Sequence, residues 1–508
     1  MDFEKALTFH ELTKHSYFSV RTDLHRLDWA NKPHPFKIYE NAEKISLPRD
    51  FPKPEKPVFK CFTAQTTSRK NISVETLASI LFFTGGITRV FKYPDGMHYF
   101  RAAPATGALY PIELYVVVGD VEGLEPGVYH FDPKTFSLNV LRKDDFRKFL
   151  AENSHPAVTE SSAVVVFTSI AWRNAWKYRE RSYRHWFWDS GVMAANMFLT
   201  CNAFDARCLF VAGFVDKQVN KLLGIDGEKE AAVIVAPIGF SSLSPASIGD
   251  VEPINLETRP LSRKEIHYPA IAEIHAASSI NSVEELDEWR RRAEAIGELS
   301  FPEKSRGHNL SVFKTEGPPL WTVILRRGST RKFTRTSISY QTFSTIVHMG
   351  STTLPTDFNG PHTRFFVIVN AVENIEPGAY TIADAKLFPV KRGEFRKISG
   401  YLCLEQELGA DAAAVFYIMA PLEKILQRMG NRGYRVAQLE GGIRAGLIYL
   451  AAYGSGVGAT GLTFYDDDVK QFFSPCSTEL ENMIVTAVGN PAYRAKPGRI
   501  VFAGSEKI

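Results

Sequence analysis

The chain contains one short phrase twice, as Glu125-Pro-Gly-Val-Tyr129 and again as Glu376-Pro-Gly-Ala-Tyr380. Each copy follows a run of apolar, largely β-branched residues, Leu114 to Val118 and Phe365 to Val369, as expected for a strand that enters a turn. The offset between the copies is 376 minus 125, or 251. A match at a fixed spacing indicates that a structural unit has been duplicated.

Two further pairs of segments keep the same order and nearly the same spacing. Arg181-Ser-Tyr-Arg184 and Arg432-Gly-Tyr-Arg435 each open a helical pattern, and they are again 251 residues apart. The last predicted strands, Ala232 to Gly239 and Met483 to Gly489, align at an offset of 489 minus 239, or 250. Three ordered matches predict two diverged copies of one fold in a single chain.

The repeats divide the 508 residues into four parts. Domain 1 is expected over residues 55 to 255 and domain 2 over residues 316 to 508. The intervening residues 256 to 315 are expected to form a helical linker, because the stretch from Ser282 to Glu298 is rich in Glu, Arg and Ala. Residues 1 to 54 contain proline-spaced segments, which favour an extended arm that wraps a neighbour.

Within each copy, strands are separated by helices, which predicts an α+β sandwich rather than a strictly alternating doubly wound sheet. The long helix of each copy carries a stripe of small residues, Ser190, Gly191, Ala194 and Ala195 in one and Gly441, Gly442, Ala445 and Gly446 in the other. Small residues allow backbones to approach closely, so the two helices are expected to pack on each other. The two domains would then form an intramolecular pseudo-dimer.

Composition excludes several classes of function. The formal charge of +4 is small for this length and no long block of Lys and Arg occurs, so nucleic acid is not an expected partner. No stretch reaches the roughly eighteen apolar residues needed to span a membrane. The five cysteines form no CxxC pair and no cluster with zinc-ligand spacing, which favours reduced thiols in a cytoplasmic protein without a metal site.

Domain 2 carries a cationic cluster, Arg326-Arg327-Gly-Ser329-Thr-Arg331, and further cations near its end at Arg494, Lys496 and Arg499. Guanidinium groups and hydroxyls suit a phosphate monoester. Two alignments of the cluster with domain 1 remain open. An offset of 266 places Lys60 to Gln65 there, which cannot form such a clamp, whereas an offset of 262 places Thr67 to Lys70 there and leaves half of one.

Each copy keeps features that the other has lost. Domain 2 keeps the glycine-rich run Gly454 to Gly461, whose bare backbone could approach a flat ligand, and its counterpart in domain 1 lacks those glycines. Domain 1 keeps the loop Ala103-Pro-Ala-Thr-Gly-Ala-Leu-Tyr-Pro111 directly before a strand. We therefore expect one complete cleft, built by both copies.

Three phrases of domain 1 carry a family resemblance, Ala108-Leu-Tyr-Pro-Ile-Glu-Leu-Tyr115, Pro126-Gly-Val-Tyr-His130 and Trp176-Lys-Tyr-Arg-Glu-Arg181. The chain resembles the flavin-dependent nitroreductase superfamily and, within it, the SagB-type dehydrogenases that oxidise thiazolines and oxazolines to azoles. Members of the superfamily are α+β dimers that hold FMN at the subunit interface. The resemblance implies an FMN-dependent oxidoreductase with one FMN site between domain 1 and domain 2.

The resemblance also implies roles for individual residues. The phosphate of FMN would be held by Arg327, Ser329, Arg331, Lys496 and Arg499. Thr460 and Gly461 would lie near the flavin edge, and the ring would be approached from domain 1 by Pro104, Ala105, Thr106 and Gly107. The catalytic pair would be Lys177 and Tyr178, either of which could act as the base, the lysine charge lowering the pKa of the phenol. Adjacent helical residues face different directions, so this segment is expected to be irregular.

The substrate is expected to be a small molecule or a peptide, and the acceptor that reoxidises the flavin is left open. An NAD(P)H-dependent nitro- or quinone reductase remains an alternative, because such enzymes need no Rossmann fingerprint. A non-catalytic flavin-binding or interaction module is a second one. Because the fusion supplies both halves of the cleft, a monomer with one FMN is expected to suffice, and further association stays open.

Overall fold

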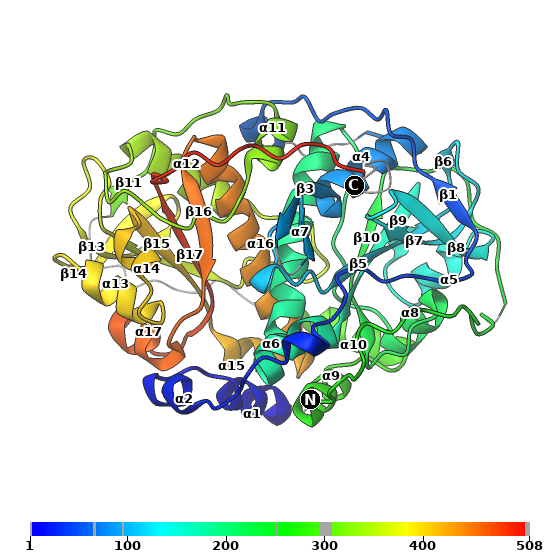
Figure 1. Ribbon diagram of the computed structural model, residues 1–508, viewed down its shortest axis with the longest axis horizontal. Helices are drawn as coiled ribbons and strands as arrows, with labels where there is room; N and C mark the ends of the chain where they lie inside the picture. The colour runs from blue at the N-terminus through cyan, green and yellow to red at the C-terminus, as the bar shows by residue number, and fades with distance from the viewer. Residues whose placement is uncertain (1–2, 64–67, 94–95, 250, 294–306, 503–508) are drawn as a thin grey trace.

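The computed structural model describes residues 3–63, 68–93, 96–249, 251–293 and 307–502. Two sheets lie on either side of a central pair of long helices, α7 (Ser182–Ala203) and α16 (Arg432–Gly454) (Figure 1). Each sheet belongs to one of the two repeats, and the helices between them form the seam. The predicted class, two tandem α+β sandwich domains that form an intramolecular pseudo-dimer, is confirmed.

The two sheets share one strand order over six strands, and the second sheet has β16 as an additional edge strand. The first has the strand order β1-β8-β7-β5-β9-β10 and the second β11-β14-β13-β12-β15-β17-β16. All neighbouring strands within them are antiparallel. The bounds in the first are β1 Lys44–Ser46, β5 Ile112–Val118, β7 Gly127–Asp132, β8 Ser137–Lys143, β9 Ala163–Ile170 and β10 Glu230–Ile238. The bounds in the second are β11 His308–Asn309, β12 Arg364–Val369, β13 Gly378–Ala383, β14 Lys386–Arg392, β15 Ala414–Ala420, β16 Gly458–Leu462 and β17 Glu481–Gly489.

Five helices of the first repeat have counterparts in the second, and the sixth helix of the second, α14, corresponds to the short turn η3 (Pro156–Val158) of the first. In the first repeat they are α3 Val58–Thr63, α4 Val74–Gly85, α5 Arg147–Glu152, α6 Ala171–Tyr178 and α8 Asp216–Leu223. In the second they are α11 Leu320–Arg326, α12 Tyr340–Gly350, α13 Arg396–Leu402, α14 Glu407–Asp411, α15 Leu422–Met429 and α17 Asp466–Phe473. The caps explain one of the matches: Ser73 and Ser339 each accept a hydrogen bond from the backbone N–H three residues on, which fixes where α4 and α12 begin.

The glycine stripes bring the two central helices into direct backbone contact. A Cβ added to Gly442 would lie 2.5 Å from the carbonyl oxygen of Trp188, and one added to Gly191 would lie 2.5 Å from the amide nitrogen of Ile443. No side chain fits at either position, so only glycine permits this separation. The predicted packing of the two long helices is therefore found, and it holds the domains together as a pseudo-dimer.

The arm and the linker depart from their predicted forms. The arm is not wholly extended, because it contains the helices α1 (Glu4–Leu12) and α2 (Tyr17–Thr22). Helix α9 (Pro269–Ala277), in the predicted linker, lies 265 residues after α1 and has the same length. Arg184 Nη2 donates to the carbonyl of His10, and Arg435 Nη2 donates to the carbonyl of His275, both at 2.8 Å. The first part of the linker therefore repeats the arm and does more than connect the domains. Residues 294–298 of the predicted linker helix lie outside the described residues.

The second linker helix and the C-terminal segment cross between the repeats. Helix α10 (Val283–Ala293) belongs to the linker but packs near α15 of domain 2. The C-terminal segment runs from domain 2 across the top of the molecule to domain 1 (Figure 1), where the amide of Arg499 donates to the carbonyl of Thr88 at 2.8 Å. Helix α10 and the C-terminal segment therefore each connect one repeat to the other.

Candidate active site

Arg327 joins the two domains at the predicted cleft. Its side chain is buried, and it donates from Nε to the carbonyl of Ala102 at 3.1 Å and from Nη2 to the carbonyls of Arg101 and Ala102 at 2.8 and 2.9 Å. Ala102 lies two residues before the loop from Pro104 to Gly107. The structure therefore brings the cationic cluster of domain 2 and the loop of domain 1 to the same place.

The hydroxyls of the cluster face the glycine-rich strand of domain 2. Ser329 Oγ lies 3.3 Å from the hydroxyl of Tyr449, which also accepts a hydrogen bond from the amide of Gly461. Thr460, beside Gly461, is buried. A Cβ added to Gly461 would find its nearest neighbour, Tyr449 Oη, only at 3.6 Å, so the strand presents open backbone here.

Arg331 of domain 2 faces the predicted catalytic pair of domain 1. Burial lowers the pKa of the Lys177 ammonium, and the charges of Arg331 and Lys32 lower it further. The Lys177 Nζ lies 5.2 Å from the centroid of the Tyr178 ring. Because a nearby cation favours the neutral amine, Lys177 is a stronger candidate base than an ordinary lysine.

Tyr178 differs from the expectation for an activated phenol. Burial and the charge of Asp189 raise its pKa to about 12, and Arg331 opposes this only in part. The prediction that Lys177 lowers the pKa of this phenol is wrong, because desolvation of the phenolate outweighs any effect of the neighbouring cation. Tyr178 is therefore a hydrogen-bond donor at neutral pH, and of the two candidate bases the structure favours Lys177.

The catalytic pair ends a helix at a strained residue. Helix α6 stops at Tyr178, and Arg179 adopts φ 48° and ψ −134°. Its counterpart at offset 251 is Gly430, with φ 61° and ψ −159°. Lys177 and Tyr178 are the last two residues of α6, so the irregular backbone begins one residue later, at Arg179. The first repeat holds at Arg179 a conformation that normally requires glycine.

The loop of domain 1 packs against Tyr178. It forms a short turn, η2 (Thr106–Ala108), in which Gly107 has φ 63°. A Cβ on Gly107 would lie 2.6 Å from the Tyr178 hydroxyl. The positive φ and this close approach both require glycine at position 107.

Lys496 and Arg499 lie on the segment that crosses from domain 2 to domain 1. Both side chains are exposed, and between them the amide of Gly498 donates to the carbonyl of Leu325 at 2.7 Å. Leu325 is two residues before Arg327, so the segment runs beside the cationic cluster. The segment that carries Lys496 and Arg499 therefore lies in the same region as Arg327. The guanidinium of Arg327 bonds to backbone carbonyls, whereas the side chains of Lys496 and Arg499 are exposed on the protein surface.

Arg89 is a candidate binding residue that the sequence interpretation missed. It lies on the hairpin of β3 (Ile87–Tyr93) and β4 (Gly96–Arg101), and its Nη2 donates to the carbonyls of Leu325 and Arg326 at 3.1 and 3.3 Å. Its Nε is buried without a hydrogen-bond partner. A buried, unsatisfied guanidinium N–H beside Arg327 suits an anionic ligand such as a phosphate monoester.

The hairpin is an insertion in the first repeat. The offset between the repeats falls from 266 at Ser73 to 251 at Glu125, a difference of 15, and the hairpin from Ile87 to Arg101 also spans 15 residues. The change of offset was therefore the sequence signal for this element. The structure also decides between the two open alignments of the cationic cluster. Helices α3 and α11 begin at Val58 and Leu320, so the offset there is 262, the alignment that leaves half a clamp in domain 1.

The second, symmetry-related cleft is closed by the chain itself. At offset 251, Phe210 corresponds to Gly461, and Thr356 corresponds to Ala105. The amide of Phe210 donates to the carbonyl of Pro355 at 2.9 Å, and the amide of Asp357 donates to Phe210 at 3.2 Å. No backbone hydrogen bond joins Gly461 to Ala105, both of which belong to the described part of the chain.

Linker residues fill the closed cleft further. The buried indole of Trp289, on α10, packs against Gly213, where a Cβ would lie 2.4 Å from the ring. The carboxylate of Asp357 accepts from the amides of Ala212 and Gly213, both at 2.8 Å. Backbone hydrogen bonds and the Trp289 indole therefore close this cleft, whereas the corresponding segments at Gly461 and Ala105, which the structure also describes, make no such backbone bond.

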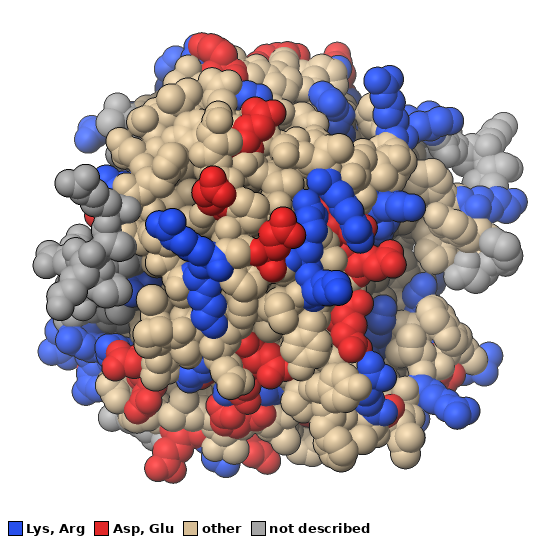
Figure 2. All heavy atoms as spheres, turned by 90° about the vertical axis from the view of Figure 1, so that its left-hand side faces the viewer, with Lys and Arg blue, Asp and Glu red and all other residues tan. Residues whose placement is uncertain are grey.

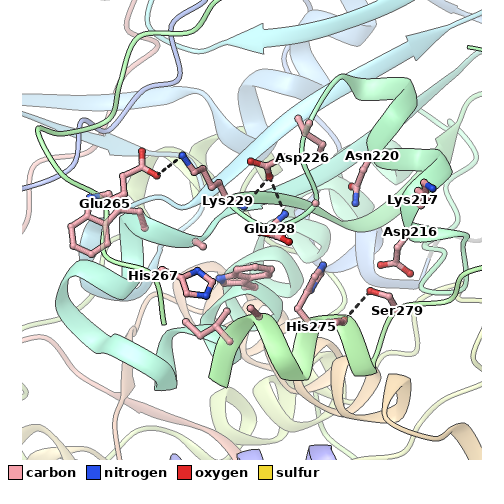
Figure 3. A pocket seen from close by; sticks show the side chains of 18 of the residues that line it. Asp216, Lys217, Asn220, Asp226, Glu228, Lys229, Glu265, His267, His275 and Ser279 are labelled. Atoms are coloured by element: carbon pink, nitrogen blue, oxygen red, sulfur yellow. Dashed lines mark hydrogen bonds and ion pairs between the residues drawn. The ribbon is translucent and has the colours of Figure 1, made fainter. Parts of the chain in front are cut away.

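A larger cavity lies elsewhere, on the flank of domain 1. It has a volume of about 810 Å³ and lies between α6, α8, α9 and the turn before β10, with His267, His275, Lys217 and Glu228 among the side chains that line it (Figure 3). None of the sequence-predicted site residues line it. Its size alone does not make it the reactive site.

The surface of domain 2 carries charges of both signs (Figure 2). On the face of domain 2 drawn in Figure 2, basic side chains lie among acidic ones and form no continuous basic patch. Within the described residues, no group of His, Cys, Asp and Glu could hold a metal ion. No described helix is both long enough and apolar enough to cross a bilayer.

Comparison with known proteins agrees with this architecture. The chain is 27% identical over 170 residues to protein MJ1384 of Methanocaldococcus jannaschii, named a nitroreductase, which covers 33% of the chain and 81% of that protein. It is 33% identical over 177 residues to the trifolitoxin-processing protein TfxB of Rhizobium leguminosarum bv. trifolii, which covers 32% of the chain and only 46% of that protein. A crystal structure from Anabaena variabilis, described as a nitroreductase, superimposes with a TM-score of 0.78 at 26% identity and covers 97% of this chain and 100% of its own.

The nitroreductase family model matches twice, over residues 67–240 and 324–484, one match in each repeat. The predicted resemblance to SagB-type members of the nitroreductase superfamily, in tandem-domain form, is confirmed. The family is one of flavin-dependent oxidoreductases. The chain belongs to the nitroreductase family.

Proposed function

We propose that the chain is an FMN-dependent oxidoreductase of the SagB type, which removes hydride from an azoline-like or other small organic substrate at a single site between its domains. The observation that carries the proposal is the asymmetry of the two clefts. In one cleft, Arg327 bonds to the backbone just before the Pro104–Gly107 loop and the charge of Arg331 acts on Lys177, which supports a site there. In the other cleft, the amide of Phe210 bonds to the carbonyl of Pro355. One complete site per chain follows.

The residues at the open cleft fit FMN. Arg89 and Arg327 supply two guanidinium groups to the same region, and burial lowers the pKa of both, while no carboxylate counts among the charges that act on them. A pair of cations without an acidic partner favours an anion. Ser329 supplies a hydroxyl, and Arg331, Lys496 and Arg499 complete the proposed phosphate contacts. Thr460, Gly461 and the Pro104–Gly107 loop would border the ring.

Lys177 and Tyr178 would carry the proton chemistry. When bound, FMN supplies a hydride acceptor. Lys177, with its lowered pKa, would remove the proton from a substrate carbon or nitrogen, and Tyr178, which stays protonated, would donate a hydrogen bond that orients the substrate. The charge of Arg331 would help to keep Lys177 in its neutral, basic form.

The substrate is proposed to be a peptide or a small molecule with an azoline-like ring. The relative TfxB is a trifolitoxin-processing protein, which favours a peptide, although the chain covers less than half of that relative. All five cysteines are free, which suits a cytoplasmic location. Because both halves of the cleft are on one chain, a monomer is proposed to be active.

The test uses the full chain loaded with FMN and a matched pair of variants. Lys177→Ala should lose substrate oxidation while it keeps bound flavin. Arg428→Ala changes the counterpart at offset 251, in the closed cleft, and should keep full turnover. Retained turnover in Lys177→Ala would refute the assigned role, and a chain that takes up no FMN would refute the function and favour a binding module.

The choice of electron donor is tested separately. MJ1384 and the Anabaena protein are both described as nitroreductases, which keeps an NAD(P)H-dependent nitro- or quinone reductase as the second candidate. Stopped-flow mixing of the oxidised holoenzyme with NADPH distinguishes the two. Rapid bleaching of the flavin would favour the reductase, whereas bleaching by an azoline-containing peptide and not by NADPH supports the proposed function.

A further inference from the structure

Asp189 holds the loop that borders the proposed flavin ring. It lies on α7, is 4% exposed, and accepts hydrogen bonds from the backbone N and the Oγ1 of Thr106 at 2.9 and 2.8 Å. In the turn that Thr106 opens, Gly107 and Ala108 have φ of 63° and 54°. A left-handed conformation at Ala108 is unfavourable, so the shape of the loop depends on its bonds to Asp189.

The same loop touches the proposed catalytic pair. Gly107 lies against the hydroxyl of Tyr178, and the charge of Asp189 contributes to the raised pKa of that phenol. Asp189 therefore acts on Tyr178 in two ways, through the position of the loop and through its own charge. Neither action requires Asp189 to touch substrate or flavin.

The other repeat provides an internal comparison. At offset 251 the counterpart of Asp189 is Glu440, which accepts from the amides of His362 and Thr363 at 2.9 and 3.0 Å. Glu440 also has a cation nearby, because Arg444 Nε lies 3.7 Å from its carboxylate. The residue at the position of Arg444 in the first repeat is Met193. The open cleft has thus kept the buried carboxylate and lost its counter-ion.

The surroundings of Asp189 supply no replacement cation within the described residues. Arg101 lines a cavity of about 10 Å³ beside Asp189, but its guanidinium N–H groups donate to the carbonyls of Ile112 and Pro35. Burial and hydrogen bonds, and no cation of the described part of the chain, act on the pKa of Asp189. Burial raises the pKa values of the neighbouring phenols, Tyr110 and Tyr178, so both are neutral.

A nearby histidine adds no charge either. Burial and the charges of Arg181 and Arg184 lower the pKa of His185 well below its usual value. For Asp189 itself, burial raises the pKa to about 7, although bonds from Thr106 and Asn174 act in the opposite direction. A carboxylate with hydrogen bonds but no cation is expected to titrate at higher pH than one with an ion pair.

We propose that Asp189 is a positioning residue, and that the ionisation of its carboxyl group controls how firmly the Pro104–Gly107 loop is held against Tyr178. The ionised carboxylate accepts charge-assisted bonds from Thr106 and keeps the loop in place. When the carboxylate is protonated, those bonds weaken and the loop loosens beside the flavin. The flavin part of this inference depends on the proposed function, whereas the protonation of Asp189 does not.

The first test needs no cofactor. Infrared difference spectra of the full chain, recorded on either side of neutral pH, should show the C=O band of a buried protonated carboxyl group at the lower pH. Asp189→Asn should remove that band, while Glu440→Gln, the matched change in the closed cleft, should leave it. A difference spectrum that is unchanged in Asp189→Asn would overturn the proposal.

The second test uses FMN as the probe. The absorption spectrum of bound FMN in the wild-type chain should change with pH around a midpoint near neutrality, and Asp189→Asn should abolish that change. Met193→Arg, which restores the cation of the other repeat, should lower the midpoint by about one pH unit or more. Glu440→Gln should titrate like the wild type. An FMN-bound wild type without such a titration, or an unchanged titration in Asp189→Asn, would refute the inference.

The two tests separate the possible failures. If the chain binds no FMN, the proposed function fails, and the infrared experiment still decides whether Asp189 carries the proton. If Met193→Arg does not fold, Thr106→Val replaces it, because the loss of one donor to the carboxylate should raise the midpoint.

Discussion

Replacement of Arg179 by glycine should stabilise the protein, although it removes a charged side chain next to the proposed catalytic pair. Arg179 adopts φ 48° and ψ −134°, while its counterpart in the other repeat is Gly430 at φ 61°. A non-glycine residue in such a region costs about 1–3 kcal/mol. The Arg179→Gly variant relieves that strain.

Two effects reduce the gain in the free energy of unfolding that Arg179→Gly should bring. Glycine adds roughly 0.5–1 kcal/mol of chain entropy to the unfolded state. Arg179 also lies 3.3 Å from Asp23 and 3.5 Å from Glu180, and such half-exposed ion pairs contribute about 0.2–1 kcal/mol at most. The balance favours Arg179→Gly by about 1 kcal/mol. For 508 residues that unfold as one unit, this corresponds to a rise in Tm of about 1 °C.

The assay is denaturant unfolding of three variants with the wild type as reference. Arg179→Ala loses the same ion pairs but keeps the strain, so it should be slightly less stable than the wild type. Gly430→Ala introduces the strain into the other repeat and should cost about 1–2 kcal/mol. If Arg179→Gly proved no more stable than Arg179→Ala, the backbone strain inferred at this position would be refuted.

Three further predictions concern the seam, a buried ion cluster and the cofactor contacts. Gly442→Ala should destabilise the chain by about 1–3 kcal/mol, measured by thermal unfolding, because the added Cβ would lie 2.5 Å from the Trp188 carbonyl oxygen. Although burial acts in the opposite direction, Arg181 and Arg184 lower the pKa of Asp466 to about 2, below the value of about 3.9 in an unfolded chain. Its stabilising contribution is therefore complete above about pH 4 and is lost as the pH falls towards 2, so the acid limb of a stability profile should flatten in Asp466→Asn. Lys496→Ala should weaken FMN binding about five-fold at low salt and less at high salt, because the side chain is exposed; an effect independent of salt in a fluorescence titration would contradict a purely electrostatic role.

The sequence predicted those parts of the fold whose residues recur in both repeats. The turn at Glu125 and the paired arginines at Arg181 and Arg432 recur because each repeat needs the same strand end and the same helix start. The glycines of α16 predicted that the two long helices approach closely, because small residues allow backbones to touch. The contact between Gly442 and Trp188 confirms this prediction. The match between α1 and α9 was hidden, because it depends on backbone carbonyls that arginines recognise, and carbonyls carry no sequence signal.

The site was predictable only in part. The cationic cluster and the Pro104–Gly107 loop stand out by composition, and the structure places them together. Arg89 does not stand out, since a single arginine in a strand is ordinary and its role comes from an inserted hairpin that reaches the other domain. The pKa of Tyr178 and the lost counter-ion of Asp189 depend on burial, which follows from packing rather than from local pattern.

The number of FMN molecules bound per chain tests the composite cleft most directly. The full-length protein would be saturated with FMN and freed of excess, and released flavin would be measured against protein concentration. Since Phe210 bonds to Pro355 across one cleft while Gly461 leaves the other open, the expected ratio is one. Two FMN molecules per chain would mean that both clefts are complete, and the assignment of a single site shared between the repeats would then be contradicted.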